Sequence, residues 1–399
     1  MRRLLVLLAF AFAACTPEDF PTETLVDRLR MLGLTSTPAD LAPGETARLQ
    51  ALVVDPSRPG QATTTFWIGC DPDPFNLNRS ACADPAVVND PSRLGDMTAL
   101  PPGVKFIGLN AQAVYAAPKG LFDALAPDDP QRAAGTSGQV LTISIAEEVS
   151  PTASMEELRA VFARVQRKEV KSLISLFRVR ISEDPERNTN PRITTLLVDD
   201  APWPTGARVM MKPAQQLRLD VEGPDEVFEP FTAQTPSGAE ARTERVLIAW
   251  YSTAGRFSEE RTALREGVKT KYTAPGAKPF DPVPERRTGT FWTVLRDTRG
   301  GLGWSEFPFF VCDEALPEPV ISRVRPLGTR GDAVVLEGAN LGSVLDVVVG
   351  GVAVARGRAD GAGATWEGEL DGAVMAGPQP VVVHTRRCER LEAGVLSVP

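Results

Sequence analysis

The sequence of 399 residues contains one histidine, His384, and only three tyrosines. A Ser-His-Asp or Cys-His catalytic unit would need His384 as its base, and a zinc site built from several histidines is excluded. His384 follows the run Val381–Val383 and alternates with it in the manner of a strand at a sheet surface. We therefore expect a strand histidine and assign no catalytic residue.

Signatures of nucleotide and nucleic-acid binding are also lacking. The formal net charge is −8 and no run of five or more basic residues occurs, so the sequence predicts no nucleic-acid partner. There is no phosphate-binding glycine loop, no dinucleotide motif and no Gly-x-Ser-x-Gly elbow. We expect a protein without a cofactor and without enzymatic activity.

The one long apolar run lies at the N-terminus. Met1-Arg2-Arg3 precedes an apolar stretch over residues 4–14, and Ala13-Ala14 leads directly into Cys15. An apolar run of about eleven residues after two positive charges is typical of a secretory signal peptide, and a membrane span needs about 20 residues. The sequence predicts export, with residues 1–14 as the signal peptide.

The segment Ala13-Ala14-Cys15 resembles the bacterial lipobox, with Phe12 at the position where that family favours Leu. The resemblance implies a diacylated Cys15 that anchors the chain in a membrane through a tether over residues 15–24, since two or three acyl chains give stable attachment. Thr16, rather than Asp, after the cysteine implies the outer membrane. The alternative is a cut after Ala13 that releases a free periplasmic or secreted protein.

Four further cysteines remain for disulfides, which form readily in exported proteins. They are Cys70, Cys82, Cys312 and Cys388. Four cysteines allow three pairings, and the absence of a Cys-x-x-Cys spacing argues against metal ligation.

The loop after Cys70 is a weak candidate for a calcium site, because it is rich in oxygen ligands. These are Asp71, Asp73, Asn76 and Asn78. The loop lacks the central Gly and the closing Glu of an EF-hand, so we expect a solvated polar loop and no metal.

Short apolar runs punctuated by Pro, Gly and Asp about every ten residues are typical of an all-β sandwich. Trp67 stands where an immunoglobulin-like domain places its buried third-strand tryptophan, and Trp250 takes the matching place in the next unit. Ser154 and Glu157 form a capping box that begins a helix over 154–168. The sequence predicts tandem immunoglobulin-like β-sandwiches with one short helical insertion in the first.

Breaks in this pattern predict domains at 25–185, 186–314 and 318–399. The last resembles an IPT/TIG domain, an immunoglobulin-like fold, through its Gly-x-Asn-x-Gly motif at 338–342 and its Val-Gly-Gly turn at 349–351. This fold implies that Cys388 lies in the turn between the last two strands, close to Cys312. It therefore favours a Cys312–Cys388 disulfide across the domain junction and a Cys70–Cys82 disulfide within one loop.

Together these features predict a non-catalytic cell-envelope lipoprotein with a binding or structural role and an unknown protein or glycan partner. The alternative is a glycan-binding accessory subunit or a glycan-active enzyme, because IPT/TIG domains also accompany starch-active enzymes. Trp203, Trp304 and Trp366 are candidates for stacking on sugars, although we expect them to pack in the interior.

Overall fold

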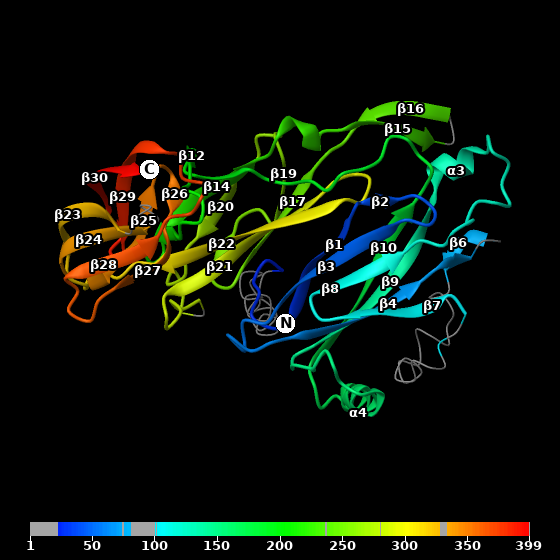
Figure 1. Ribbon diagram of the computed structural model, residues 1–399, viewed down its shortest axis with the longest axis horizontal. Helices are drawn as coiled ribbons and strands as arrows, with labels where there is room; N and C mark the ends of the chain where they lie inside the picture. Colours follow the sequence, from blue (N-terminus) through cyan, green and yellow to red (C-terminus); the bar gives the residue numbers. More distant parts are fainter. Residues whose placement is uncertain are drawn as a thin grey trace, which may run out of the picture.

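The computed structural model describes residues 23–73, 76–80, 100, 102–235, 238–279, 281–327 and 333–398. Three sandwiches of two sheets each follow one another along the chain and along the long axis of the molecule (Figure 1). The first sandwich lies at the right of the figure and the third at the left. The predicted architecture of tandem immunoglobulin-like β-sandwiches is confirmed.

The first sandwich packs the sheet β1–β3–β8 against the sheet β2–β10–β9–β4–β7. Its strands are β1 (Arg30–Thr37), β2 (Asp40–Leu41), β3 (Thr46–Val54), β4 (Thr64–Cys70), β7 (Val104–Leu109), β8 (Gln112–Ala116), β9 (Thr136–Ile145) and β10 (Ser172–Ile181), and β5 (Pro72–Asp73) and β6 (Asn76–Ser80) form a separate hairpin. Trp67 is fully buried, as predicted, and its indole N–H donates to the carbonyl of Asn110 at 2.7 Å.

Helix α4 (Met155–Gln166) covers the outer face of this second sheet, below the first sandwich in Figure 1. Its apolar stripe includes Phe162, which packs on Phe66 of β4 with ring centroids 4.7 Å apart. The predicted capping box is present, with Ser154 and Glu157 each accepting a hydrogen bond from the backbone N–H of the other. Because a sheet lies on one side and the helix on the other, β4 is buried on both faces, and from Phe66 to Cys70 its sequence is apolar without alternation.

The structure has a second, short helix, α3 (Pro130–Ala134), whereas the sequence predicts only the helix over 154–168. Asp129 is its N-cap and accepts a hydrogen bond from the backbone N–H of Gln131 at 2.8 Å. A helix of five residues has no apolar periodicity to detect, so the sequence pattern does not reveal it.

The second sandwich packs the sheet β12–β11–β14–β20–β18 against the sheet β13–β22–β21–β17–β19. Its strands are β11 (Thr195–Val198), β12 (Ala201–Pro202), β13 (Val209–Met211), β14 (Gln216–Glu222), β17 (Leu247–Ser252), β18 (Arg256–Phe257), β19 (Arg261–Ala263), β20 (Thr270–Thr273), β21 (Thr288–Arg296) and β22 (Leu302–Val311). Trp250 is buried as predicted, and its indole N–H donates to Thr262 at 2.9 Å. A separate hairpin, β15 (Pro230–Thr235) and β16 (Gly238–Thr243), extends from this sandwich toward α3 of the first (Figure 1).

The third sandwich packs the sheet β23–β24–β28–β27 against the sheet β26–β25–β29–β30. Its strands are β23 (Val320–Leu327), β24 (Ala333–Ala339), β25 (Val344–Val349), β26 (Val352–Ala353), β27 (Ala355–Ala359), β28 (Thr365–Glu369), β29 (Gly377–Thr385) and β30 (Arg390–Val398). Trp366 is buried in its core. Gly357 is required beside it, because a Cβ there would lie 1.9 Å from the indole ring.

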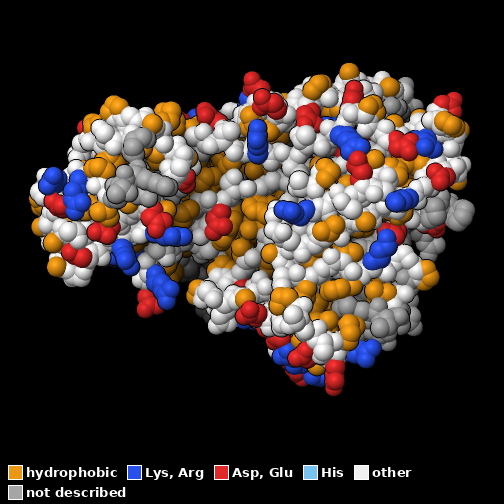
Figure 2. Space-filling model, in the orientation of Figure 1, with side chains coloured by type: hydrophobic (Ala, Val, Ile, Leu, Met, Phe, Trp, Pro, Cys, Tyr) orange, Lys and Arg blue, Asp and Glu red, His pale blue; other side chains and the backbone are white. Residues whose placement is uncertain are grey.

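Acidic and basic side chains are interspersed over the face shown in Figure 2, and hydrophobic side chains gather over the middle of the molecule. Charges of opposite sign are therefore mixed on this face rather than segregated. Within the part of the chain that the structure describes, no helix is long and apolar enough to cross a bilayer.

Candidate functional site

The first junction, between the first and second sandwiches, has an apolar seam. Val26 and Leu32 from the N-terminal part of the chain are buried in one cluster with Trp292, Val294 and Leu302 of β21 and β22. Trp304 packs against the same cluster. The seam thus lies between side chains of β1 and β3 in the first sandwich and side chains of β17, β21 and β22 in the second.

Beside the seam, Arg299 occupies the centre of a buried charge network. Its side chain is only 5% exposed and forms ion pairs with Glu244 and Glu229. The guanidinium also donates to the carbonyl of Glu186 in the segment that links the two sandwiches, and it lies over the ring of Phe231. A buried guanidinium with two carboxylates is stable only while all of these partners stay in place.

The linking segment is bonded to both sandwiches. The backbone N–H of Asn188 donates to Asp40 of β2 at 3.1 Å, and its side-chain amide donates to Asp297 at 3.2 Å. The side-chain amide of Asn190 donates to the carbonyl of Ser36 at 2.7 Å. These bonds fix the linker in one position between the two sandwiches.

Burial changes the acidity of this network. Desolvation raises the pKa of Glu244 to about 7, although its ion pair with Arg299 opposes the rise. Burial likewise raises the pKa of Asp297, against hydrogen bonds from Gly301 and Asn188. Around neutral pH the first junction therefore contains a carboxyl group that is partly protonated.

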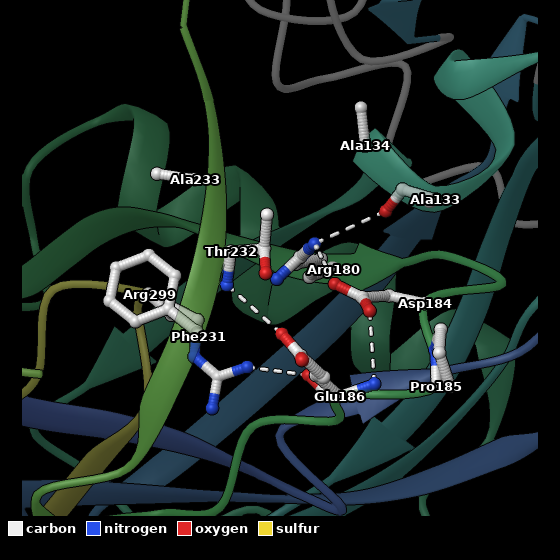
Figure 3. Close-up of a pocket in the computed structure, with 10 residues that line it drawn as sticks. All are labelled: Ala133, Ala134, Arg180, Asp184, Pro185, Glu186, Phe231, Thr232, Ala233 and Arg299. Carbon is white, nitrogen blue, oxygen red and sulfur yellow. Dashed lines mark hydrogen bonds and ion pairs between the residues drawn. The ribbon is translucent and has the colours of Figure 1, made fainter. Parts of the chain in front are cut away.

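A cavity of about 370 Å³ opens next to this network, between α3, the linker and the β15–β16 hairpin (Figure 3). Its lining residues are Ala133, Ala134, Arg180, Asp184, Pro185, Glu186, Phe231, Thr232, Ala233 and Arg299. Arg180 pairs with Asp184 at 3.4 Å, and Glu186 accepts from the backbone N–H of Thr232 at 2.9 Å. The charged residues that line the cavity thus all have partners in the chain, and the cavity lies between parts of the first and second sandwiches.

The second junction, between the second and third sandwiches, is covalent. Cys312 and Cys388 form the predicted disulfide, and the backbone N–H of Asp313 donates to the carbonyl of Arg386 at 2.8 Å. Cys388 lies in the turn between β29 and β30, as the IPT/TIG resemblance implies. The prediction of this disulfide is therefore confirmed.

Away from the disulfide, a short backbone bridge joins the same two sandwiches. Thr205 pairs with Val352 in a parallel bridge. The backbone N–H of Arg208 donates to the carboxylate of Asp346 at 2.9 Å. The second junction thus has a covalent bond at one end and backbone bonds at the other.

A second cavity, of about 390 Å³, lies at the second junction and contains His384 in its wall. His384 is 2% exposed, and its ring lies 5.5 Å from that of Trp203. Burial, aided by the charge of Arg390, lowers the pKa of His384 to about 4, so the imidazole is neutral at pH 7. Our expectation of a histidine at a sheet surface was wrong, because the second sandwich covers that sheet face.

The remaining predicted site residues belong to the first sandwich and the N-terminus. Cys70 is disulfide-bonded. Cys82 and Cys15 lie outside the described residues, so the Cys70–Cys82 pairing and the lipidation of Cys15 stay predictions.

The loop after Cys70 does not gather its carboxylates around a common point. Asp71 pairs with Lys105 at 2.6 Å and accepts a hydrogen bond from Tyr115 at 3.3 Å. Asn76 is exposed, and the side chain of Asn78 is outside the described set. Among the residues that the structure describes, no three His, Cys, Asp or Glu side chains are placed to hold a metal.

The three tryptophans considered for sugar stacking all pack against other groups. Trp366 is in the core of the third sandwich, Trp304 is in the apolar seam, and Trp203 packs on the core of the second sandwich. Sequence reasoning missed the Arg299 network, whose members lie 55 and 70 residues apart and have no characteristic spacing.

No family model matches this chain, and no curated protein matches it. Among solved structures, it is similar to the SGBP-B protein of the Bacteroides ovatus mixed-linkage glucan utilization locus, in complex with a mixed-linkage heptasaccharide. That match has 12% identity over 53% of this chain and 48% of the other, with a TM-score of 0.16. The chain thus spans about half the length of that protein.

Two further similarities are of the same kind. The human desmocollin-1 ectodomain matches with 10% identity over 94% of this chain and 59% of its own, with a TM-score of 0.18. The Salmonella enterica SafA pilin in complex with the SafB chaperone matches with 10% identity over 52% and 97%, with a TM-score of 0.25. At these TM-scores the similarities carry no argument about function, which has to come from the structure itself.

Proposed function

We propose that this chain is an exported, non-catalytic lipoprotein of the cell envelope, anchored in the outer membrane through Cys15. Its three sandwiches act as one rigid body that presents binding surfaces at a fixed distance from the membrane. The observation that carries the proposal is that bonds cross both junctions: the hydroxyl of Thr35 in the first sandwich donates to the carbonyl of Leu302 in the second at 2.6 Å, and the Cys312–Cys388 disulfide crosses the second junction.

The start of the described chain supports a short attachment. The backbone N–H of Ser252 donates to the carbonyl of Thr24 at 2.9 Å, and that of Val26 donates back to Ser252 at 2.8 Å. Thr24 and Val26 are therefore bonded to the second sandwich. Eight residues separate Cys15 from Thr24, and eight residues reach about 28 Å at most. A lipid on Cys15 would hold the second sandwich close to the bilayer.

We also propose that the third sandwich is an IPT/TIG domain. Gly350 and Gly351 form the two-residue turn between β25 and β26, and both have positive φ, of 58° and 87°. A two-residue hairpin of this kind needs φ > 0 at both positions, which is why glycines occur there. Asn340 of the Gly-x-Asn-x-Gly motif is also left-handed, with φ 56°.

The test of the anchor is the intact mass of the protein extracted with detergent from the membranes of its host. The expected mass is that of residues 16–399 plus a diacylglyceryl-modified Cys15. A Cys15→Ser variant should leave the membrane fraction, whereas a Thr16→Ser variant should remain in it. An unmodified mass beginning near Ala14 would overturn the lipid anchor.

A further inference from the structure

The cavity at the second junction has a regular floor, made by the outward face of three paired strands. Val348 of β25 lies opposite Val382 of β29, and Val382 lies opposite Glu392 of β30. In the next row along, His384 lies opposite Arg390. The floor is therefore aliphatic in its middle and carries one basic, one acidic and one imidazole group along its β29–β30 side.

The second sandwich forms the opposite wall. Pro204 lines the cavity together with Val348 and Val382, and Trp203 contacts the ring of His384. The cavity is thus closed on one side by the turn that follows β12, while the β30 side remains open to solvent, where Val395 is 66% exposed. A small molecule can enter from that side and lie on the aliphatic floor.

One buried polar atom in this wall lacks a partner. Nδ1 of His384 is inaccessible to solvent and makes no hydrogen bond. Buried polar atoms nearly always have a partner, and an unmet one costs about 1–3 kcal/mol. Since solvent does not reach this nitrogen, a ligand in the cavity changes the surroundings of the imidazole ring without bonding to Nδ1.

Two charged groups at the open side are also available. Within the described residues, neither Arg390 nor Glu392 has an ion-pair or hydrogen-bond partner, and both are exposed. They lie two residues apart on the same face of β30, a spacing of about 7 Å along a strand. A zwitterion carries one negative and one positive group. At this spacing its carboxylate can lie about 3 Å from the guanidinium of Arg390 while its ammonium group lies about 3 Å from the carboxylate of Glu392.

We propose that this cavity binds a small zwitterion with an aliphatic body, the chemistry of an apolar amino acid or a short apolar peptide. Its carboxylate pairs with the guanidinium of Arg390, beside His384 in the wall of the cavity. Its ammonium group pairs with Glu392, and its aliphatic groups pack on Val348, Val382 and Pro380. The aliphatic floor gains from burial of the ligand's apolar surface.

Other ligand chemistries leave part of the site unmatched. A phosphate would place two negative charges beside Glu392. An aliphatic monocarboxylate would satisfy Arg390 and leave Glu392 without a partner, and a neutral amide would leave both charges without one. The size of the cavity, about 390 Å³, is within the range of small-ligand sites and suits a dipeptide better than a single amino acid.

The single histidine makes the test direct. The exported chain is purified in detergent without a histidine tag and is isotope-labelled only at histidine. Its NMR spectrum then contains the imidazole signals of His384 alone. Leucyl-leucine is titrated first, followed by leucine, octanoate and N-acetyl-leucinamide. We expect a saturable shift of the His384 signal with leucyl-leucine, and affinities at least about tenfold weaker for octanoate and N-acetyl-leucinamide.

The variants Arg390→Gln and Glu392→Gln remove one exposed charge each, so the fold is retained. Each should weaken leucyl-leucine binding about tenfold or more. Arg358→Gln, which removes an exposed arginine from β27 of the other sheet, should leave the affinity within about twofold. Leucine binding as tightly as leucyl-leucine would assign the site to the free amino acid.

The proposal is overturned if leucyl-leucine gives no saturable shift, if octanoate binds as tightly, or if Arg390→Gln binds leucyl-leucine like the parent. None of these results depends on the lipid anchor, which the intact mass tests separately.

Discussion

The two junctions hold neighbouring sandwiches together by different physical means. The first junction buries an apolar seam and is crossed by hydrogen bonds such as that from Thr35 to Leu302, and beside it Arg299 is buried between two carboxylates of the second sandwich. The second uses one disulfide and a short backbone bridge, and it leaves a buried imidazole nitrogen without a partner. A buried charge network needs close contact on every side, whereas a disulfide needs only two side chains. Both junctions border a cavity, but the arginines that line the first are paired with carboxylates of the chain, whereas the exposed Arg390 at the second is not paired within the described residues.

The largest expected effect comes from Arg299, which lies beside the first junction. Arg299→Met would leave Glu244 and Glu229 buried without their cation, which costs about 3–5 kcal/mol in the free energy of unfolding. Denaturant unfolding monitored by tryptophan fluorescence measures this loss. The matched control is Arg242→Met, which breaks an exposed pair with Glu240 and should cost less than about 1 kcal/mol. Equal effects of the two variants would contradict a buried network.

The next effect concerns the covalent bond of the second junction. The Cys312–Cys388 disulfide spans 76 residues, and replacing both cysteines by Ser should lower the free energy of unfolding by about 2–4 kcal/mol. Calorimetry should show the loss in the transition of the third sandwich, with the transition of the first two unchanged. A uniform loss across all transitions would mean that the junctions are not independent.

The two junctions should respond to pH with opposite sign. Glu244 has a folded-state pKa of about 7, above its unfolded value of 4.5, so the folded state binds more protons between these values. The stability of the first junction is therefore highest near pH 4.5 and falls as the pH rises to 7. His384 has a folded-state pKa of about 4, below its unfolded value of 6.5, so stability is complete above pH 6.5 and falls as the pH drops to 4.

Each of these changes is on the order of 3 kcal/mol over its pH window. Asp346 and Arg390, which lie opposite His384 on the neighbouring strands, and the Trp203 ring are the groups that face it. The measurement is the free energy of unfolding from pH 4 to pH 8. In Glu244→Gln the fall in stability between pH 4.5 and 7 should be absent, and in His384→Gln the fall between pH 6.5 and 4 should be absent. A Glu244→Gln variant that keeps the slope of the parent would show that another group titrates.

The smallest effect is expected for an arginine that crosses the second junction. The side chain of Arg208 is 41% exposed and lies 3.7 Å from Asp346. Arg208→Met keeps the backbone N–H that donates to Asp346, so it should cost less than about 1 kcal/mol, compared with 3–5 kcal/mol for Arg299→Met. A loss as large as that of Arg299→Met would show that the second junction also depends on buried charge.

The sequence predicted those features that depend on neighbouring residues or on a known fold. The capping box of Ser154 and Glu157, the buried Trp67 and Trp250, and the Cys312–Cys388 disulfide were all correct. The short helix α3 was missed because five residues carry no periodicity.

Contacts between sandwiches were not predictable in the same way. Alternation along β29 shows which side chains leave the core of the third sandwich, but it does not show that Trp203 covers one of them. His384 was therefore placed at the surface, although it is buried. The Arg299 network was missed for a similar reason, because the residues that pair with Arg299 are distant from it in the sequence.

The central claim is that the three sandwiches form one rigid body. Spin labels at Ile174→Cys in the first sandwich and Met375→Cys in the third, both at exposed positions, allow their separation to be measured by pulsed electron paramagnetic resonance. The account predicts a single narrow distance distribution, which broadens in the Cys312→Ser/Cys388→Ser variant. A broad distribution in the disulfide-bonded protein would contradict the rigid body and, with it, the proposal that these sandwiches hold binding surfaces at a fixed distance from the membrane.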